Sequence, residues 1–215
     1  MHIPDGFIAP EMYLPAYGVA AGLWTYGLRR LQAGLGEETI PRLAVLTAFS
    51  FVVMMVMVPL PGGTSAHATG IALLAILFGV WTAFMAVSLV LLLQALLFGG
   101  GGVTALPVNA LAMGMVGSMV AWYTYRLLRP VNEGFAVVAA GWLSINVSAL
   151  LVALALGLQP VIAHGEDGQP LFFPFGLSVT LPAVMLPHAV IGIGEGVLTL
   201  LMWRFIRRRG WFLEP

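Results

Sequence analysis

The first two residues of the chain, Met1 and His2, form a candidate metal chelate. The terminal amine, the main-chain nitrogen of His2 and its imidazole Nδ1 can close adjacent rings around one ion. Histidine can stand at position 2 of any protein, so this pattern alone is weak evidence. We expect the bulky His2 to protect Met1 from removal, and the Met1 amine to be free. Affinity should then fall from about pH 8 to about pH 5, because protons compete for these nitrogens.

His67 supplies a second imidazole. It follows the Pro-Gly-Gly sequence of residues 61–63 and is expected to begin a short helix over residues 67–78, at a protein-lined mouth. With the chelate it completes a set of four nitrogen donors, which tends toward square-planar geometry and favours Ni(II) or Cu(II) over Zn(II) or Mg(II). The alternative is a histidine at a helix start that only makes hydrogen bonds, with Thr64 or Ser65 as the cap.

The composition is that of a polytopic helical membrane protein. Of the 215 residues, 60% are hydrophobic and 8% are charged, and the mean hydropathy is +0.98. A soluble domain has about 25% charged residues. Cysteine is absent, which excludes disulfides and thiolate metal sites, and lysine is absent, which excludes a GxxxxGK phosphate loop. Any energy from ATP must therefore come through another chain.

The chain is predicted to be an all-α bundle of seven transmembrane helices. Five apolar stretches have roughly membrane-spanning length: residues 11–28, 43–60, 107–128, 135–157 and 181–203. The run over residues 67–98 is too long for one crossing, at about 48 Å, and too short for two full ones. If it breaks near Gly79 and crosses twice, all nine arginines fall on one side, as the positive-inside rule prefers.

This topology predicts a multi-pass protein of the cell membrane, with the N-terminus outside and the C-terminus in the cytoplasm. We expect a single transmembrane metal-binding domain, 1–215, with an outer metal-binding strip at 1–10 and the helix bundle at 11–209. Three of the four histidines then lie in outer segments, and His188 begins the last helix near the same face. That arrangement suits metal capture from outside, although chance alone produces it fairly often.

His188 and Glu195 are the remaining polar candidates inside the bundle. They are seven residues apart and so share one face of the last helix, where a carboxylate is a functional candidate by default. We favour the alternative that both only make hydrogen bonds between helices, with Asn109, Asn146 or Gln94.

Four ordered sequence blocks resemble those of the CbiM/NikM family, the substrate-binding membrane subunits of energy-coupling-factor transporters for cobalt and nickel. The blocks are residues 1–7 (MHIPDGF), 59–70 (PLPGGTSAHATG), 94–106 (QALLFG and GGVTAL, apart from Gly100) and 187–196 (PHAVIGIGEG). The resemblance covers nearly the whole chain. It implies a seven-helix bundle and a metal held by the Met1 amine, the His2 amide and imidazole, and the His67 imidazole.

The resemblance also implies partners. These are a transmembrane coupling subunit, cytoplasmic ATPase subunits, a small accessory membrane subunit and the lipid bilayer, with no nucleic acid. The chain ends eleven residues after Arg204, so we expect the accessory subunit not to be fused to it. The chain departs from the family pattern at Gly100, at Pro107 and at Ala112, which affects the expected affinity and metal preference more than the site itself.

We expect the chain to capture Ni2+ or Co2+ at the outer face and to deliver it inward, without making or breaking a bond. One alternative is an intramembrane metalloenzyme that uses His67, His188 and Glu195, although no HExxH helix is present. Another is an ion-coupled secondary carrier, which should show repeated halves and several charges at mid-membrane. Only Glu195 is such a charge, and no repeat is visible.

Overall fold

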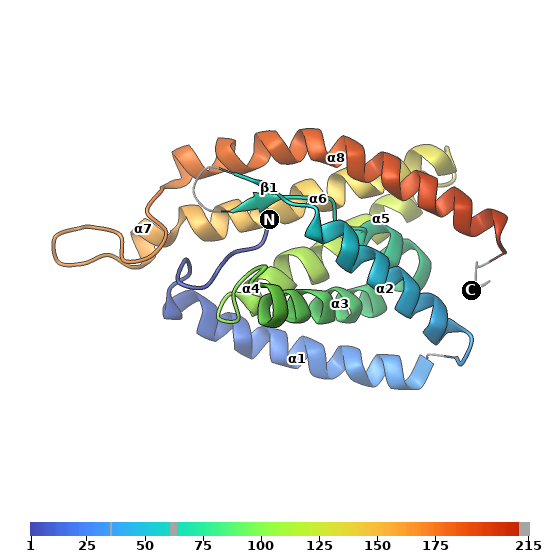
Figure 1. Cartoon of the computed structure of the whole chain (residues 1–215), viewed down its shortest axis with the longest axis horizontal. Coiled ribbons are helices and arrows are strands. Elements are labelled where there is room, and N and C mark those ends of the chain that lie inside the picture. Colours follow the sequence, from blue (N-terminus) through green and yellow to red (C-terminus); the bar gives the residue numbers. More distant parts are fainter. Residues whose placement is uncertain (35, 61–63, 211–215) are drawn as a thin grey trace.

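The computed structural model describes residues 1–34, 36–60 and 64–210, which form an elongated bundle of helices (Figure 1). The elements in chain order are α1 (Pro10–Gly34), α2 (Thr39–Met55), β1 (Val58–Pro59), β2 (Ser65–Ala66), α3 (Ile71–Phe98), α4 (Leu106–Asn109), the π-helix Ala110–Gly117, α5 (Ser118–Leu128), α6 (Glu133–Gly157), α7 (Gln159–Ile162) and α8 (Leu177–Arg208). The two short strands pair only with each other. The all-α membrane bundle is therefore confirmed.

The expectation of seven transmembrane helices is wrong. Within the described ranges, four helical runs are long and apolar enough to cross a membrane: Ile71–Phe98, Leu106–Leu128, Glu133–Ile162 and Leu177–Arg208. α2 has 17 residues and is only a shorter apolar helix. α1 is long enough but is not among the four, because tyrosines, prolines and two arginines interrupt its apolar residues. Sequence windows of suitable length therefore overstated the number of membrane-spanning helices.

α3 is interrupted at Gly79, where the sequence predicted a break. Gly79 has φ 80° and ψ 170°, a conformation that side chains disfavour and that cannot continue a helix. A straight helix of 28 residues would be about 42 Å long, yet both ends of α3 lead to residues that lie against His2. α3 therefore folds back at Gly79. Its first arm, up to Gly79, is about 12 Å long, which is too short to cross a bilayer by itself.

The arginines gather at one end of the bundle, which we call the arginine end. Figure 1 shows the C-terminal ends of α1 and α8 and the start of α2 at that end, and α5 also finishes there. The nine arginines all lie at or next to these helix ends: Arg29, Arg30, Arg42, Arg126, Arg129, Arg204, Arg207, Arg208 and Arg209.

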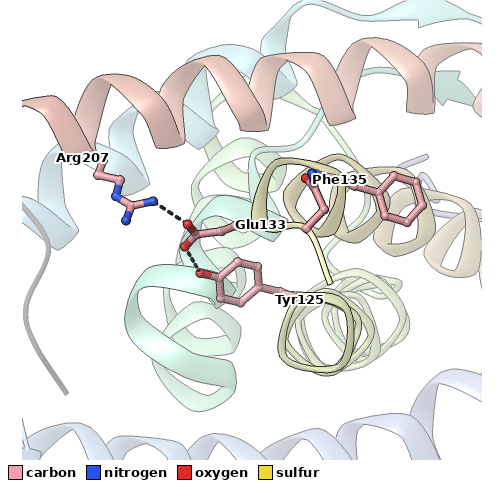
Figure 2. Close-up of polar contacts among 5 residues, drawn as sticks. Tyr125, Glu133, Phe135 and Arg207 are labelled. Carbon is pink, nitrogen blue, oxygen red and sulfur yellow. Dashed lines mark hydrogen bonds and ion pairs between the residues drawn. The ribbon is translucent and has the colours of Figure 1, made fainter. Parts of the chain in front are cut away.

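Polar contacts join three helices at the arginine end (Figure 2). Glu133, the first residue of α6, forms an ion pair with Arg207 of α8 and accepts a hydrogen bond of 2.9 Å from the Tyr125 hydroxyl of α5. Asn132 caps α6 by accepting a hydrogen bond of 2.8 Å from the Phe135 N–H. These contacts fix the α5–α6 turn against the end of α8.

α6 and α8 pack against each other along most of their length. They can approach because glycines face each other: a Cβ at Gly141 would lie 3.0 Å from the Cα of Gly196. Close packing through small residues is the usual way in which membrane helices associate. α8 thus becomes a rigid support for side chains on its buried face.

His67 does not begin a helix, contrary to expectation. It lies in extended chain between β2 and α3, and α3 starts only at Ile71, behind Gly70 at φ 69°. Neither Thr64 nor Ser65 caps that helix. The Pro-Gly-Gly sequence of residues 61–63 lies outside the described residues. The pairing of β1 with β2 therefore leads the chain directly to His67.

Candidate metal centre

The N-terminal strip, residues 1–10, enters the bundle and is held there by hydrogen bonds to its main chain. The side-chain amide of Asn109 pairs with Ile3: the Ile3 N–H donates to Oδ1 at 3.1 Å, and Nδ2 donates to the Ile3 carbonyl at 3.2 Å. The Gly102 N–H donates to the same carbonyl at 2.9 Å. A Cβ at Gly102 would lie 2.4 Å from the Asp5 nitrogen, so this close approach requires glycine.

Asp5 joins the strip to the loop after α3. Its carboxylate accepts hydrogen bonds from the N–H groups of Val103 (3.1 Å) and Thr104 (2.8 Å) and from the Thr104 hydroxyl. Partial burial raises the pKa of Asp5, but the hydrogen bonds outweigh burial and hold this pKa below its ordinary value. Further along, the Ala9 N–H donates to Oε1 of Gln159 at 2.8 Å. The strip is therefore fixed at several points along its length.

The structure brings Met1, His2 and His67 together. All three are buried, with exposed fractions of 0%, 3% and 1%, so they lie inside the bundle and not at an open mouth. The ring centroids of His2 and His67 are 4.5 Å apart, and the ring planes are tilted by 32°. Both ring nitrogens of His2 and Nε2 of His67 are buried without a hydrogen-bond partner among the described residues. Unpartnered buried polar atoms are rare and mark this place as a candidate site.

The Met1 amine is the third basic group of the cluster. Its described hydrogen bond is to the Ser65 hydroxyl of β2, at 3.3 Å. Burial lowers the pKa of this amine to about 4. Burial, and next the charge of the nearby terminus, lowers the pKa of His2 to about 3. Both groups are therefore neutral at pH 7, which is the form that binds a metal ion.

The ring of His67 is oriented by the main chain. Its Nδ1 lies 3.0 Å from the Ala68 carbonyl oxygen, so a proton on Nδ1 makes this hydrogen bond and leaves the lone pair on Nε2. Metal-binding histidines usually hold their second nitrogen in this way. Burial, followed by the charges of the terminus and of His2, lowers the pKa of His67. His67 is thus also a neutral ligand candidate.

Glu195 of α8 holds the chain that follows His67. Its buried carboxylate accepts hydrogen bonds from the Thr69 N–H (2.7 Å), the Gly70 N–H (2.9 Å) and the Thr69 hydroxyl (3.0 Å). A carboxylate with several such donors can fix a loop firmly. Glu195 therefore ties the segment beside His67 to a transmembrane helix.

The hydrogen-bond partners that the sequence suggested for His188 and Glu195 are wrong. Asn109 pairs with Ile3, whereas the described bonds of Asn146 and Gln94 go to main-chain oxygens of α6 and α2, respectively. His188 contacts the Val184 carbonyl of its own helix, and His164 lies in an exposed loop. The sequence could not assign these partners, because a polar residue in an apolar run requires a partner without indicating which one.

Sequence reasoning missed the roles of Asn109 and Gly102 at the site, although it named Asn109 as a possible partner of His188 or Glu195. A signal for Asn109 was present, since an amide in an otherwise apolar stretch needs hydrogen bonds. The run of four glycines at residues 99–102 indicated a close backbone approach, but not to which segment. Within the described residues no three His, Cys, Asp or Glu side chains converge on a metal position. The candidate centre therefore depends on the Met1 amine and main-chain nitrogen as well as on imidazoles.

Comparison with known proteins gives the same family over the whole length. Residues 2–212 match the model of the family CbiM, described as the cobalt uptake substrate-specific transmembrane region. The chain is 40% identical over 212 residues to the "Probable fused nickel transport protein LarMN" of Lactiplantibacillus plantarum, covering 97% of this chain and 65% of the relative. It is 41% identical to the "Fused nickel transport protein NikMN" of Rhodobacter capsulatus, covering 94% of this chain and 61% of the relative. The chain thus spans less than two thirds of these two relatives.

A solved structure supports the same assignment. The "Crystal Structure of an Truncated Transition metal Transporter" superposes with a TM-score of 0.94 at 37% identity, and the match covers 97% of this chain and 99% of that one. The "Cobalt transport protein CbiM" of Thermosipho melanesiensis is 32% identical, covering 94% of this chain and 84% of the relative. The expected family is confirmed: the chain belongs to the CbiM family of cobalt uptake substrate-specific transmembrane regions.

Proposed function

We propose that this chain captures Ni2+ or Co2+ and delivers it across the membrane as the substrate-specificity subunit of an ATP-driven energy-coupling-factor transporter. The observation that carries the proposal is the meeting of Met1, His2 and His67 in one buried place where imidazole nitrogens have no described partner. Membership in a metal-uptake family makes a metal ion the natural occupant of this place.

The proposed ligands are the Met1 amine, the main-chain nitrogen and Nδ1 of His2, and Nε2 of His67. Three of these nitrogens belong to two adjacent residues, so they close two chelate rings around the ion. The His67 ring lies next to the His2 ring and supplies the fourth donor from a distant part of the sequence. Four nitrogens in a plane suit Ni2+ better than Co2+.

The burial of the site lowers the competition from protons. At neutral pH the Met1 amine and His2 carry no proton that a metal must displace, because burial lowers their pKa values to about 4 and about 3. The main-chain nitrogen of His2 must lose its proton to become a ligand. We therefore propose that loading releases one proton for each metal ion.

Burial also means that the strip must open to load the site. Met1 and His2 are covered, and the strip is held by Asn109 and by the Asp5 contacts. We propose that the end of the bundle with the strip faces outward and that the arginine end faces the cytoplasm, in accordance with the positive-inside rule. Metal would then be captured from outside.

The partners in this proposal are a transmembrane coupling subunit and cytoplasmic ATPases, with a small accessory membrane subunit. The absence of lysine from the sequence supports ATP hydrolysis on other chains. Gly18 and Gly22 of α1 support an outer docking face, because a Cβ at either position would have no atom within 4 Å. Such a surface lets another helix approach closely.

The test is a Ni2+ titration of the chain with its native terminus beside two variants. One variant carries a flexible Gly/Ser-rich segment before Met1, and the other is His67→Ala. Each should weaken binding by more than about 100-fold, the upper effect of an outer-shell change, because a ligand itself is lost or displaced. His164→Ala is the matched control, since His164 lies in an exposed loop and should leave affinity unchanged. Tight binding by the extended chain would overturn the role of the amine.

A further inference from the structure

His188 is a buried histidine that the proposed chelate does not use. It lies on α8 with an exposed fraction of 0%. Its Nδ1 is 2.7 Å from the Val184 carbonyl oxygen, one helical turn earlier, so Nδ1 carries the proton in this contact. Nε2 then presents a lone pair, and it has no hydrogen-bond partner among the described residues. Buried polar atoms in proteins are nearly always hydrogen-bonded, so a histidine that served only in packing would have a donor beside this Nε2.

His188 and His67 share one arrangement of the imidazole. In each ring Nδ1 contacts a main-chain carbonyl, at 2.7 Å and 3.0 Å, and in each ring Nε2 is buried and unpartnered. A histidine ligand held through its second nitrogen is the arrangement that metal sites prefer, because it fixes both tautomer and ring direction. The two rings are therefore equally prepared to bind a metal through Nε2.

α8 also lies against the chain on both sides of His67. It contacts β2 (Ser65–Ala66), which precedes His67, and Glu195 accepts hydrogen bonds from Thr69 and Gly70, which follow it. His188 precedes Glu195 by seven residues, so the two share one face of α8. His188 thus lies on the helix face that holds the His67 segment in place.

We propose that Nε2 of His67 and Nε2 of His188 form a second coordination position for the transported metal, deeper in the bundle than the N-terminal chelate. This inference rests on the proposed function and assigns His188 a role in it. His67 is common to both positions, so the ion can exchange its other ligands without leaving that ring. The strip withdraws its amine and the His2 nitrogens, His188 takes the ion, and the His2 main-chain nitrogen regains a proton from water. No oxidation or reduction is involved.

The inner position binds the metal ion more weakly than the chelate does. A transport path needs such weaker sites. Two imidazoles without chelate rings hold a metal less tightly than four nitrogens do. Conduction paths require sites from which an ion can leave as well as enter. The position therefore serves as an intermediate stage and not as the storage site.

The test uses Co2+, because its visible absorption reports the number and type of ligands. The chain with a flexible Gly/Ser-rich segment before Met1 lacks the amine at the chelate and isolates the inner position. It should retain weak binding, and His188→Asn in this extended chain should lower the residual affinity by at least about tenfold. Asparagine keeps an N–H near Nδ1 for the Val184 carbonyl and removes only Nε2. His164→Asn in the same extended chain is the matched control and should change nothing.

His188→Asn with the native terminus should still bind Co2+ tightly and with an unchanged spectrum, which also shows that it folds. Loss of tight binding there would overturn the inference, since His188 would then belong to the resting site or to the fold. An extended chain without residual binding, or one indifferent to His188→Asn, would overturn it too. The proposed function fails by a different result, namely weak binding by the unaltered native chain.

Discussion

The arginine end of the bundle and the opposite end, which holds residues 1–10 and which we call the strip end, differ in the exposure and charge of their basic groups. At the arginine end, charged groups remain near water: the side chains of Arg207 and Glu133 are 58% and 36% exposed and pair with each other (Figure 2). At the strip end, basic nitrogens are buried without a described charged partner, and burial lowers the pKa of the Met1 amine to about 4. The side chains of the ion pair at the arginine end therefore stay charged, whereas the Met1 amine at the strip end is neutral.

The difference shows where this chain can hold a cation. The exposed Arg207–Glu133 pair satisfies its own charges and leaves nothing for a ligand. Neutral nitrogens with free lone pairs need a partner and can find one in a metal ion. The strip end is therefore suited to binding, and the arginine end to orientation in the membrane.

Among changes outside the proposed ligands, the largest effect is expected from Gly102→Ala. The added Cβ would lie 2.4 Å from the Asp5 nitrogen, so the strip must move away from the loop and carry Met1 and His2 with it. Ni2+ affinity, measured by calorimetry, should fall by about 100-fold, at the upper end of changes outside the ligand shell. Gly100→Ala is the matched control, because its Cβ would meet only ordinary contacts, at 3.5 Å or more, and binding should be retained. Equal affinities of the two variants would refute the positioning role of the loop.

Asn109→Ala should have the next largest effect. It removes both hydrogen bonds to Ile3 and leaves the strip less well held. We expect a loss of Ni2+ affinity of about tenfold or more, together with faster hydrogen exchange at the Ile3 amide. Asn146→Ala serves for comparison, because its described side-chain bond lies within α6. An unchanged exchange rate at Ile3 would show that other contacts hold the strip.

The third prediction concerns protons. Since Met1 and His2 are neutral at pH 7, loading should release one proton for each Ni2+, from the His2 main-chain nitrogen. Affinity should therefore rise about tenfold for each pH unit between about pH 5 and 8. Indicator dye in weakly buffered solution measures this release. Affinity is still expected to fall on acidification, as the sequence predicted. The competing proton is now that of the His2 main-chain nitrogen, and not those of an exposed amine and imidazole. Two or more protons per ion would mean that the amine is not neutral before loading.

Glu133→Gln, at the arginine end, should have the smallest effect. It breaks the exposed ion pair to Arg207, and such pairs contribute roughly 0–1 kcal/mol. We expect a slightly lower melting temperature and unchanged Ni2+ affinity, measured on the same sample. A loss of affinity would indicate that the two ends of the bundle are coupled.

Several features of the fold and the candidate site could be read from residue types. The break at Gly79 was predictable, because a largely apolar run of 32 residues fits neither one crossing nor two. Met1, His2 and His67 were chosen as candidate ligands because few other groups in the chain can bind a metal through nitrogen, and the structure brings the three together. Their role as ligands stays a prediction. The helix expected to start at His67 was not correct, since Glu195, 128 residues away, holds Thr69 and Gly70 in a non-helical conformation.

The sequence by itself determined the class of the protein, the candidate ligands and the side of the bundle on which the arginines gather, because composition, residue chemistry and charge are local properties. Only the tertiary structure decided that the strip is buried, that Asn109 holds Ile3, and that His188 and His67 present the same free nitrogen. It also decided that, over residues 1–34, 36–60 and 64–210, four helical runs and not seven have the length and hydropathy of membrane spans. These features depend on contacts between residues far apart in the chain, and no local pattern specifies such contacts.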